Sequence, residues 1–193
     1  MTLVFATNNE NKIKEIKTFI PKSIKLLSLN DIGCFEKIEE NGKTIPENAL
    51  IKSRYIKNKY GYNCFSDDTG LEIDKLNGEP GIFSARYAGI PVNSDKNIDL
   101  VLKKMKHQTD RSAQFKTFIS LNLENNNELF QGIVMGQIMK FPQGKNGFGY
   151  DSIFIPNGSN KTFAELSLIK KNEISHRGIA LKKLINYLIK LKL

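Results

Sequence analysis

Two long extended stretches constrain the fold more than any other feature of the sequence. Residues 113–123 alternate large apolar residues with polar or smaller ones, and residues 129–139 form a second extended stretch after Asn125-Asn126-Asn127. A period of two is typical of β-strands, and a short asparagine-rich connection between two strands predicts a hairpin. We therefore expect a long β-hairpin in the second half of the chain.

Helices alternate with short strands through the rest of the chain. An apolar strand at residues 3–6 leads through a polar loop into a helix that carries Ile13, Ile16 and Ile20 and ends at Pro21. Turn and capping signals predict further helices over residues 47–60, 94–105 with Ser94 as N-cap, and 175–191, and short strands over residues 63–66, 71–73 and 153–155. This order predicts an α/β fold with one mixed sheet, which the hairpin divides into two lobes.

The composition fits one globular domain. The chain has 193 residues, of which 40% are hydrophobic and 25% charged, so residues 1–193 can form a single core. No apolar run approaches the ~20 residues that a membrane helix needs, and the first residues lack the basic flank and apolar stretch of a secretory signal. We therefore expect a cytoplasmic protein with no membrane contact, in which Cys34 and Cys64 stay reduced.

Positive charge is concentrated towards the C-terminal end. There are 29 lysine and arginine residues against 20 aspartate and glutamate residues, and residues 161–193 alone hold eight basic and two acidic residues. Such a segment either contacts a nucleic-acid backbone or forms a solvated helix face. Nucleic-acid binding also needs exposed aromatic side chains among the basic ones, and Phe163 and Tyr187 are weak support for it.

Four polar clusters interrupt the apolar patterns, as is typical of functional sites. The first is Thr7-Asn8-Asn9 together with Lys12, at the start of the first expected helix. Free N–H groups, hydroxyl and amide side chains and an ammonium at a helix start can bind an anion such as phosphate. The alternative is that Asn8 or Asn9 only caps the helix.

The second and third clusters are acidic. They are Glu39-Glu40-Asn41-Gly42 and Asp67-Asp68-Thr69-Gly70, and the latter is expected at the end of the strand over residues 63–66. Mg²⁺ prefers a few carboxylates together with water and phosphate oxygens, so acidic residues converging from two loops would suit it. An aspartate turn and a solvated acidic loop are the alternatives. Lys52 lies four positions after Asn48, on the same helix face, and either reaches the carboxylates or a phosphate or stays solvated.

The fourth cluster combines residues 146–151 with Ser175-His176-Arg177. Glycines on both sides of Phe148 allow its ring to stand clear of the backbone and stack on a flat ligand. His176 and Arg177 at a helix start can donate hydrogen bonds to carbonyl oxygens. The alternative places Phe148 in the core and both His176 and Arg177 on the surface.

Taken together, the clusters resemble the pattern of one known family. The segments FATNNENKIKEI, EENGKTIPENALIKSR, SDDTGLEIDKLNGEPGIFSARYAG, GKNGFGYDSIF and EISHRGIALKKL occur in its order and at about its spacing. On these motifs the chain resembles the Ham1/RdgB-like inosine triphosphate pyrophosphatases, over nearly its whole length. The resemblance implies an ITPase-like fold, with an elongated mixed β-sheet in two lobes, flanking helices and an active-site cleft between the lobes, in a homodimer.

The resemblance also implies roles for individual residues. Glu40 and Asp68 are similar to the residues that hold Mg²⁺, and Asp68 also to the catalytic base, with Asp67 as its support. Lys12 and Lys52 resemble lysines that act on the phosphates during catalysis. The implied substrate-binding residues are Thr7, Asn8, Asn9, Lys12, Thr69, Phe148, Gly149, Tyr150, Asp151, Lys171, His176 and Arg177, and Ser84–Arg86 belong to a motif behind the site.

The implied reaction is Mg²⁺-assisted attack of water on the α-phosphorus of ITP, dITP or XTP, which gives a nucleoside monophosphate and pyrophosphate. Donors such as Arg177 would pair with a 6-oxo group but not with the 6-amino group of adenine, which favours the 6-oxo base about ten- to hundredfold per contact. Two other functions stay open. One is a basic nucleic-acid-binding module, and the other is a Maf-like pyrophosphatase acting on modified pyrimidines or ordinary nucleotides.

Overall fold

A computed structural model describes residues 1–124 and 126–191 of the chain. The helices are α1 (Glu10–Lys17), α2 (Ile45–Tyr60), α3 (Ser94–Lys104), α4 (Leu168–Ile174) and α5 (His176–Lys190). The strands are β1 (Thr2–Phe5), β2 (Lys25–Leu27), β3 (Cys64–Ile73), β4 (Ser112–Leu123), β5 (Asn126–Ile138) and β6 (Phe154–Pro156). Within the described residues, no helix combines the length and the apolar character that crossing a membrane requires.

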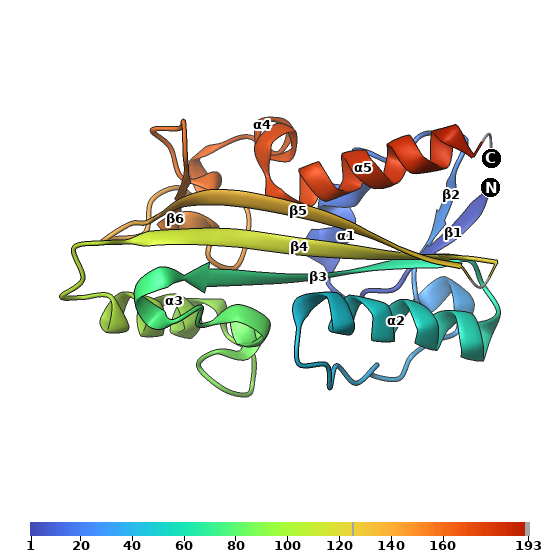
Figure 1. The fold of residues 1–193 in the computed structure, drawn as a ribbon, viewed down its shortest axis with the longest axis horizontal. Coiled ribbons are helices and arrows are strands. Elements are labelled where there is room, and N and C mark those ends of the chain that lie inside the picture. The colour runs from blue at the N-terminus through green and yellow to red at the C-terminus, as the bar shows by residue number, and fades with distance from the viewer. Residues whose placement is uncertain (125, 192–193) are drawn as a thin grey trace. The chain divides into compact units, whose positions relative to one another are not determined.

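The six strands form one mixed sheet in the order β2-β1-β3-β4-β5-β6 (Figure 1). β1 pairs in parallel with both β2 and β3, whereas β5 and β6 pair antiparallel. The neighbouring strands β4 and β5 follow each other in the chain and form the expected long hairpin. The prediction of an α/β fold with a mixed sheet is therefore confirmed.

The chain forms two compact units. The first unit comprises Met1–Asp68, Thr117–Gln131 and Ile179–Leu193, and the second comprises Thr69–Lys116 and Gly132–Gly178. Three strands and one helix cross the boundary, because β3, β4, β5 and α5 each contribute residues to both units. The expected division into two parts is thus found, whereas the assignment of residues 1–193 to a single functional domain stays a prediction.

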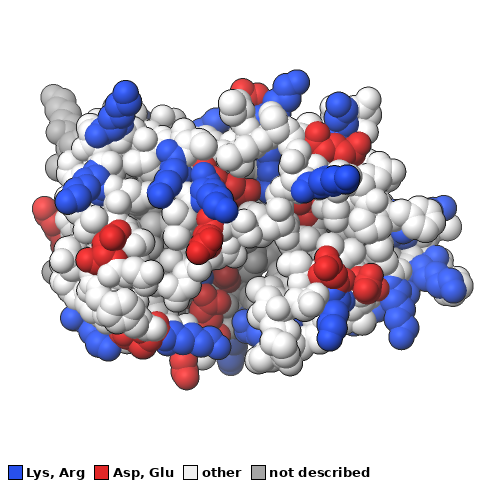
Figure 2. Space-filling view, turned by 180° about the vertical axis from the view of Figure 1, so that it is seen from behind, with Lys and Arg blue, Asp and Glu red and all other residues white. Residues whose placement is uncertain are grey.

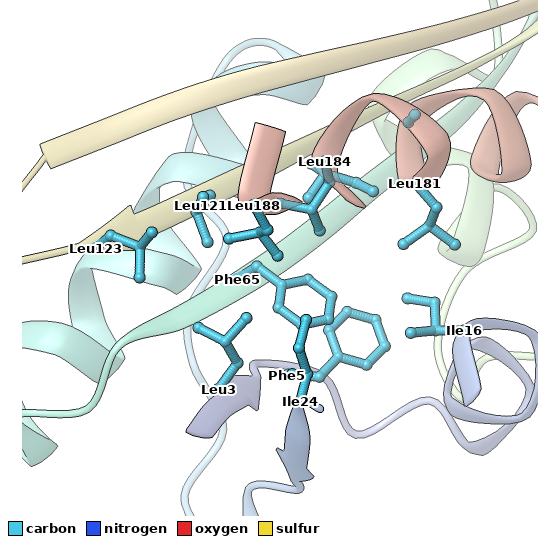
Figure 3. Packing of buried hydrophobic residues seen from close by; sticks show 12 residues of the cluster. Leu3, Phe5, Ile16, Ile24, Phe65, Leu121, Leu123, Leu181, Leu184 and Leu188 are labelled. Carbon is cyan, nitrogen blue, oxygen red and sulfur yellow. The ribbon is translucent and has the colours of Figure 1, made fainter. Parts of the chain in front are cut away.

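The first unit buries both faces of β1. Leu3 and Phe5 belong to a core with α5, in which the rings of Phe5 and Phe65 stack with centroids 4.7 Å apart (Figure 3). Val4 and Ala6, which alternate with them, belong to a separate core that includes Ile56 of α2. Since successive strand residues point to opposite faces, α5 and α2 cover opposite sides of this part of the sheet.

The second unit has its own core of twelve buried residues. Leu71 and Ile73 of β3 and Ala113 and Phe115 of β4 pack with Val101 and its neighbours on α3. Phe115 also contacts Phe154 edge to face, with ring centroids 4.8 Å apart. This apolar cluster includes Tyr150 of the loop over residues 146–151, which precedes β6, while Ser175-His176-Arg177 lie where α5 begins.

Several boundaries differ from the expectation. The first helix ends at Lys17 rather than at Pro21, and α2 begins at Ile45, two residues before the expected start, because Thr44 caps it. Asn93 caps α3 in place of Ser94, since the Asn93 side chain accepts a hydrogen bond from the N–H group of Lys96. Helix α4 was not expected, because its seven residues are too short to give a clear period.

The largest difference concerns Asp67-Asp68-Thr69-Gly70. The sequence predicted that a strand ends there, but β3 continues through all four residues to Ile73. Buried carboxylates are tolerated in a strand when they are paired with cations. Here Asp67 and Asp68 pair with lysines more than ten residues away in the sequence, which a local pattern does not reveal.

Candidate functional site

Strand β3 distributes the two aspartates to two helices. Asp67 alternates with Asp68 along the strand, so the two side chains point to opposite faces of the sheet. The Asp67 carboxylate accepts a hydrogen bond from the ammonium of Lys12 on α1, at 3.0 Å. Asp68 faces α2, where the Lys52 ammonium lies 3.7 Å away. The next residue, Thr69, is the first of the second unit.

Lys52 joins the two acidic clusters. Its ammonium lies 2.6 Å from a carboxylate oxygen of Glu40 and 3.7 Å from one of Asp68, and its side chain is only 8% exposed. Glu40 and Asp68 are 28 positions apart in the sequence, yet both reach one positive charge. The two expected metal-binding carboxylates therefore lie close together in the first unit.

The electrostatics of this group depend on burial and on its neighbours. Burial raises the pKa of Asp68, the ammonium groups of Lys52 and Lys12 oppose that shift, and the nearby Glu40 and Asp67 add to it. Burial alone would lower the pKa of Lys52, but the carboxylates of Asp68 and Glu40 outweigh it, so the Lys52 pKa is raised. Lys52 therefore stays protonated at neutral pH, and Asp68 is a stronger base than an exposed aspartate.

The first polar cluster has a structural role in this structure. Asn9 is the N-cap of α1, and its side-chain oxygen accepts hydrogen bonds from the N–H groups of Asn11 and Lys12. Thr7 supports it, because its hydroxyl accepts a hydrogen bond from the Asn9 N–H group at 3.2 Å. Asn8 is exposed. The capping alternative thus holds for Asn9, and the cap places Lys12 in the first turn of α1.

The second unit brings together a ring and two cations. Phe148 is half-buried, with the Lys171 ammonium 5.0 Å and the Arg177 guanidinium 5.5 Å from its ring centroid. Arg177 also donates a hydrogen bond to the Thr69 hydroxyl at 3.1 Å. Lys171 and Arg177 are almost fully buried. The alternative that put Phe148 in the core and Arg177 on the surface is therefore wrong.

Asp151 holds the loop that carries Phe148. Its carboxylate accepts hydrogen bonds from the Phe148 N–H group at 2.8 Å and from the Lys171 ammonium at 2.5 Å. Gly147 must be glycine, because its φ is +76° and a Cβ atom there would lie 2.1 Å from the Asp151 carboxylate. Gly149 also has a positive φ, of 60°. Asp151 and Gly147 thus fix the backbone conformation of the loop that carries the Phe148 ring.

Two expected substrate-binding residues are buried inside the second unit. His176 is buried and stacks on Phe115, with ring centroids 4.5 Å apart, so it is not on the surface. Tyr150 is buried, and its hydroxyl donates to the backbone oxygen of Ser84 at 2.9 Å. The hydroxyl of Ser84 in turn accepts a hydrogen bond from the N–H group of Leu71 in β3. These three residues support the site through the packing behind it.

Sequence reasoning singled out Lys52 but gave no role to Asn48. Asn48 is fully buried one helical turn before Lys52, and its side-chain oxygen accepts a hydrogen bond from the Gly42 N–H group at 2.9 Å. Its amide nitrogen has no hydrogen-bond partner among the residues that the structure describes. The signal was present in the sequence, since Asn48 and Lys52 share one helix face.

Comparison with known proteins supports the motif-based resemblance. The model of the Ham1 family matches residues 3–187 of the chain. A dITP/XTP pyrophosphatase of Christiangramia forsetii is 56% identical over 190 residues, which cover 98% of this chain and 100% of that protein. The dITP/XTP pyrophosphatase of Flavobacterium johnsoniae is 55% identical over 188 residues, covering 97% of this chain and 98% of that protein.

Solved structures agree with the sequence comparison. The Ham1 protein of Staphylococcus aureus matches with a TM-score of 0.90 at 39% identity, over 98% of this chain and 99% of that one. A HAM1 protein from Coxiella burnetii matches with a TM-score of 0.91 at 37% identity, over the same shares of the two chains. With the family model, the relatives and the fold in agreement, this chain belongs to the Ham1 family.

Proposed function

We propose that this protein hydrolyses non-standard purine nucleoside triphosphates such as dITP, XTP and ITP to the nucleoside monophosphate and pyrophosphate. The proposal is supported by close relatives named dITP/XTP pyrophosphatases over nearly the full chain. Within the structure it rests on one observation, the convergence of Glu40 and Asp68 on the buried Lys52 ammonium. Carboxylates and lysines together are the groups that phosphoryl transfer requires.

The donor set of the first unit fits a divalent cation. Glu40, Asp67 and Asp68 supply three carboxylates against the two ammonium groups of Lys12 and Lys52, so the group carries one net negative charge when all are ionised. A polyphosphate would be repelled by that charge unless a cation is added. Mg²⁺ needs only one or two carboxylates besides water and phosphate oxygens. Among the described residues, no three or more His, Cys, Asp or Glu side chains are grouped so that they could hold a metal ion.

Glu40 and Asp68 would hold Mg²⁺ in this proposal. The ion, when bound, would neutralise phosphate charge and stabilise the pyrophosphate that leaves. The buried Asn48 amide nitrogen, which lacks a partner among the described residues, is an added donor for an acceptor oxygen beside Lys52. Activity should disappear when a chelator removes divalent cations and return when Mg²⁺ is restored.

The reaction then follows from the groups of the first unit. Asp68 accepts a proton from a water molecule while the water oxygen bonds to the α-phosphorus. The bond between the α-phosphorus and the α–β bridging oxygen breaks, and that oxygen leaves with the pyrophosphate. Its pKa, raised by burial, makes Asp68 a better acceptor than an exposed aspartate. Lys12 and Lys52 bind the phosphate oxygens and stabilise the charge on the leaving pyrophosphate. Asp67 fixes the position of the Lys12 ammonium.

The groups of the second unit would recognise the base. A purine stacks on the half-buried Phe148 ring, as bases do on aromatic side chains in other nucleotide-binding proteins. Arg177 donates to a 6-oxo group, while the hydrogen bond to Thr69 limits the orientations of its guanidinium. A 6-amino group would leave that donor without an acceptor, which disfavours adenine.

Isotope labelling tests the reaction and its point of attack. In water enriched in oxygen-18, hydrolysis of ITP should place the heavy oxygen in inosine monophosphate and none in the released pyrophosphate. Release of orthophosphate, or label in the pyrophosphate, would contradict attack at the α-phosphorus. The same assay with a chelator gives the metal requirement.

We further propose that the protein acts as a cytoplasmic homodimer without a nucleic-acid partner. On the face shown in Figure 2, lysine and arginine side chains are spread out, with aspartate and glutamate among them. A nucleic-acid footprint is instead a continuous basic patch or stripe. Light scattering should give about twice the chain mass of 21.9 kDa for the dimer, and a salt-sensitive gel shift would favour the nucleic-acid alternative.

A further inference from the structure

The segment that carries Glu40 has an unexpected regularity. Between η1 (Asn30–Ile32) and α2, the residues 34–44 form neither a helix nor a strand, yet the exposure of residues 34–43 alternates. The even positions from 34 to 42 are buried or half-buried, and the odd positions from 35 to 43 are all exposed. A period of two is the mark of an extended backbone that lies along a surface. We call residues 34–44 the strap.

The surface beneath the strap is one face of α2. Gly42 donates its N–H group to Asn48 at 2.9 Å, and Glu40 pairs with Lys52 at 2.6 Å. Ile38 belongs to the same buried cluster as Ile56. At the far end the strap reaches the last turns of α2. The strap therefore runs antiparallel to the helix, and Gly42 and Glu40 contact successive turns of it.

Glu36 anchors the far end of the strap. Its carboxylate accepts hydrogen bonds from the Tyr55 hydroxyl at 2.7 Å, from the Tyr60 hydroxyl at 2.7 and 3.0 Å, and from the Lys59 ammonium at 2.8 Å. The bond from Lys59 and those from the two tyrosines hold the pKa of Glu36 well below its usual range. Glu36 is thus ionised and held by three donors. Such charge-assisted hydrogen bonds are the stronger kind.

The spacing of the contacts leaves the strap little slack. Asn48, Lys52, Tyr55 and Lys59 follow one another at intervals of four, three and four residues, which places them on one helix face. The eleven steps from Asn48 to Lys59 span about 16 Å of helix. The six steps from Glu36 to Gly42 span about 20 Å when fully extended. The two lengths are similar, and the alternating exposure of residues 34–43 agrees with an extended strap between these anchors.

The near end of the strap is held as tightly. A Cβ atom on Gly42 would lie 2.7 Å from the side-chain oxygen of Asn48 and 2.8 Å from the Cβ atom of Glu47. The backbone at this point therefore touches the helix. Glu47 also accepts hydrogen bonds from the N–H groups of Lys43 and Thr44. Between this end and Glu36, the strap offers Glu40 only a narrow range of positions.

We propose that Glu36 is a positioning residue, which holds Glu40 at Lys52 by keeping the strap extended along α2. The inference rests on the proposed function for the role of Glu40, but the anchoring itself does not. Without the Glu36 anchor the strap gains conformational freedom, and Glu40 must be ordered again whenever a cation binds. Glu36 would thereby act on the metal requirement without touching the substrate.

The test compares Glu36→Ala with a matched control. Glu39→Ala removes the same charge from the same strap, closer to Glu40, at an odd-numbered and exposed position. Amide hydrogen exchange of residues 35–43 measures how well the strap is ordered. Titration with Mn²⁺, followed by its electron spin resonance signal, measures the affinity of the cation site. Neither measurement depends on turnover. The Mg²⁺ concentration for half-maximal ITP hydrolysis measures the consequence for activity.

Glu36→Ala should speed amide exchange in the strap and raise both the Mn²⁺ dissociation constant and the Mg²⁺ midpoint by about tenfold, the scale of one lost charge-assisted hydrogen bond. The rate at saturating Mg²⁺ should stay near that of the wild type. Glu39→Ala should change these quantities much less. Tyr60→Phe removes one donor to Glu36 and no charge. It should change the exchange rate and the two cation constants in the same direction as Glu36→Ala. It provides a second, milder variant in case Glu36→Ala does not fold.

Two results would overturn the proposal. One is an unchanged rate of amide exchange in the strap of Glu36→Ala and Tyr60→Phe, which would show that Glu36 does not anchor the strap. The other is an equal weakening of cation binding by Glu39→Ala, which would reduce the effect of Glu36 to charge alone. A wild-type enzyme that hydrolyses ITP without any divalent cation would instead contradict the proposed role of Glu40, while the exchange data would still decide on the anchor.

Discussion

The two units carry functional groups of different chemistry. The first unit holds a network of opposite charges, in which Lys12 and Lys52 pair with three carboxylates inside the fold. The second unit holds a ring, Phe148, with two cations beside it, of which Lys171 forms an ion pair with Asp151. A charge network can bind phosphates and move a proton but does not distinguish one base from another. A ring with a fixed donor can distinguish bases but has no means of hydrolysis.

This difference implies a division of work. Changes in the first unit should lower the rate with every nucleotide by a similar factor. Changes in the second unit should alter affinity and the preference among bases. Asp68 and Thr69 are consecutive residues of β3, so one strand supplies residues to both tasks.

The largest effect is expected from Asp68→Asn, which keeps the size of the side chain but removes its basicity. The turnover rate should fall by about a hundredfold or more, as for loss of a general base, and equally for ITP and ATP. In the wild type the rate should decline as pH falls through a pKa that burial holds above the ordinary value of 3.8. If Asp68→Asn kept its turnover rate, or if the rate fell for only one of the two nucleotides, the assignment of catalysis to the first unit would be wrong.

Lys52→Met tests the charge network through stability. Removing this buried ammonium leaves Glu40 and Asp68 near each other without their common partner, which should cost about 3 to 5 kcal/mol of unfolding free energy. Urea denaturation in the presence of a chelator measures it. The matched control is Lys104→Met in the second unit, whose pair with Glu79 is exposed and should contribute less than about 1 kcal/mol. If both variants lost the same unfolding free energy, burial would not be the reason that the Lys52 ion pairs stabilise the fold.

Phe148→Ala should separate base from phosphate recognition. Loss of base stacking should raise the KM for ITP by about ten- to a hundredfold. Inorganic tripolyphosphate, which has no base, serves as the control because its inhibition constant should not change. If tripolyphosphate binding weakened as much as ITP binding, Phe148 would be acting on the phosphates or on the fold.

Thr69→Val is expected to have the smallest effect. It removes the hydroxyl that accepts a hydrogen bond from Arg177 but keeps the shape of the side chain. The preference for ITP over ATP should fall by about fivefold, the scale of one ordinary hydrogen bond. The rate at saturating ITP should hardly change. An undiminished preference would show that this hydrogen bond does not orient Arg177 for the base.

Local patterns predicted the elements well where the pattern was apolar. The hairpin, β1 and α2 follow from periodicity and capping. The strand through Asp67 and Asp68 was missed, because its polar residues are neutralised by Lys12 and Lys52, which lie far away in sequence. A rule that reads polar residues as strand ends fails wherever ion pairs are buried.

The candidate site could be predicted only in part, because the sequence does not show which residues pair with one another. The residue types and their order indicated phosphate and base recognition, but the partners were not visible. The side chain of Asn9 caps α1, and the His176 ring stacks on Phe115. Asp151 accepts a hydrogen bond from the backbone of the Phe148 loop. The strap was also hidden, because the alternating exposure of residues 34–43 arises only when the segment lies along the face of α2.

The most direct test of the account is a panel of nucleotides assayed for pyrophosphate. ITP, dITP and XTP should release pyrophosphate far faster than ATP and GTP in the presence of Mg²⁺, and Phe148→Ala should narrow that difference while Asp68→Asn lowers all rates together. Equal rates for all five nucleotides with the wild type, or orthophosphate in place of pyrophosphate, would contradict it.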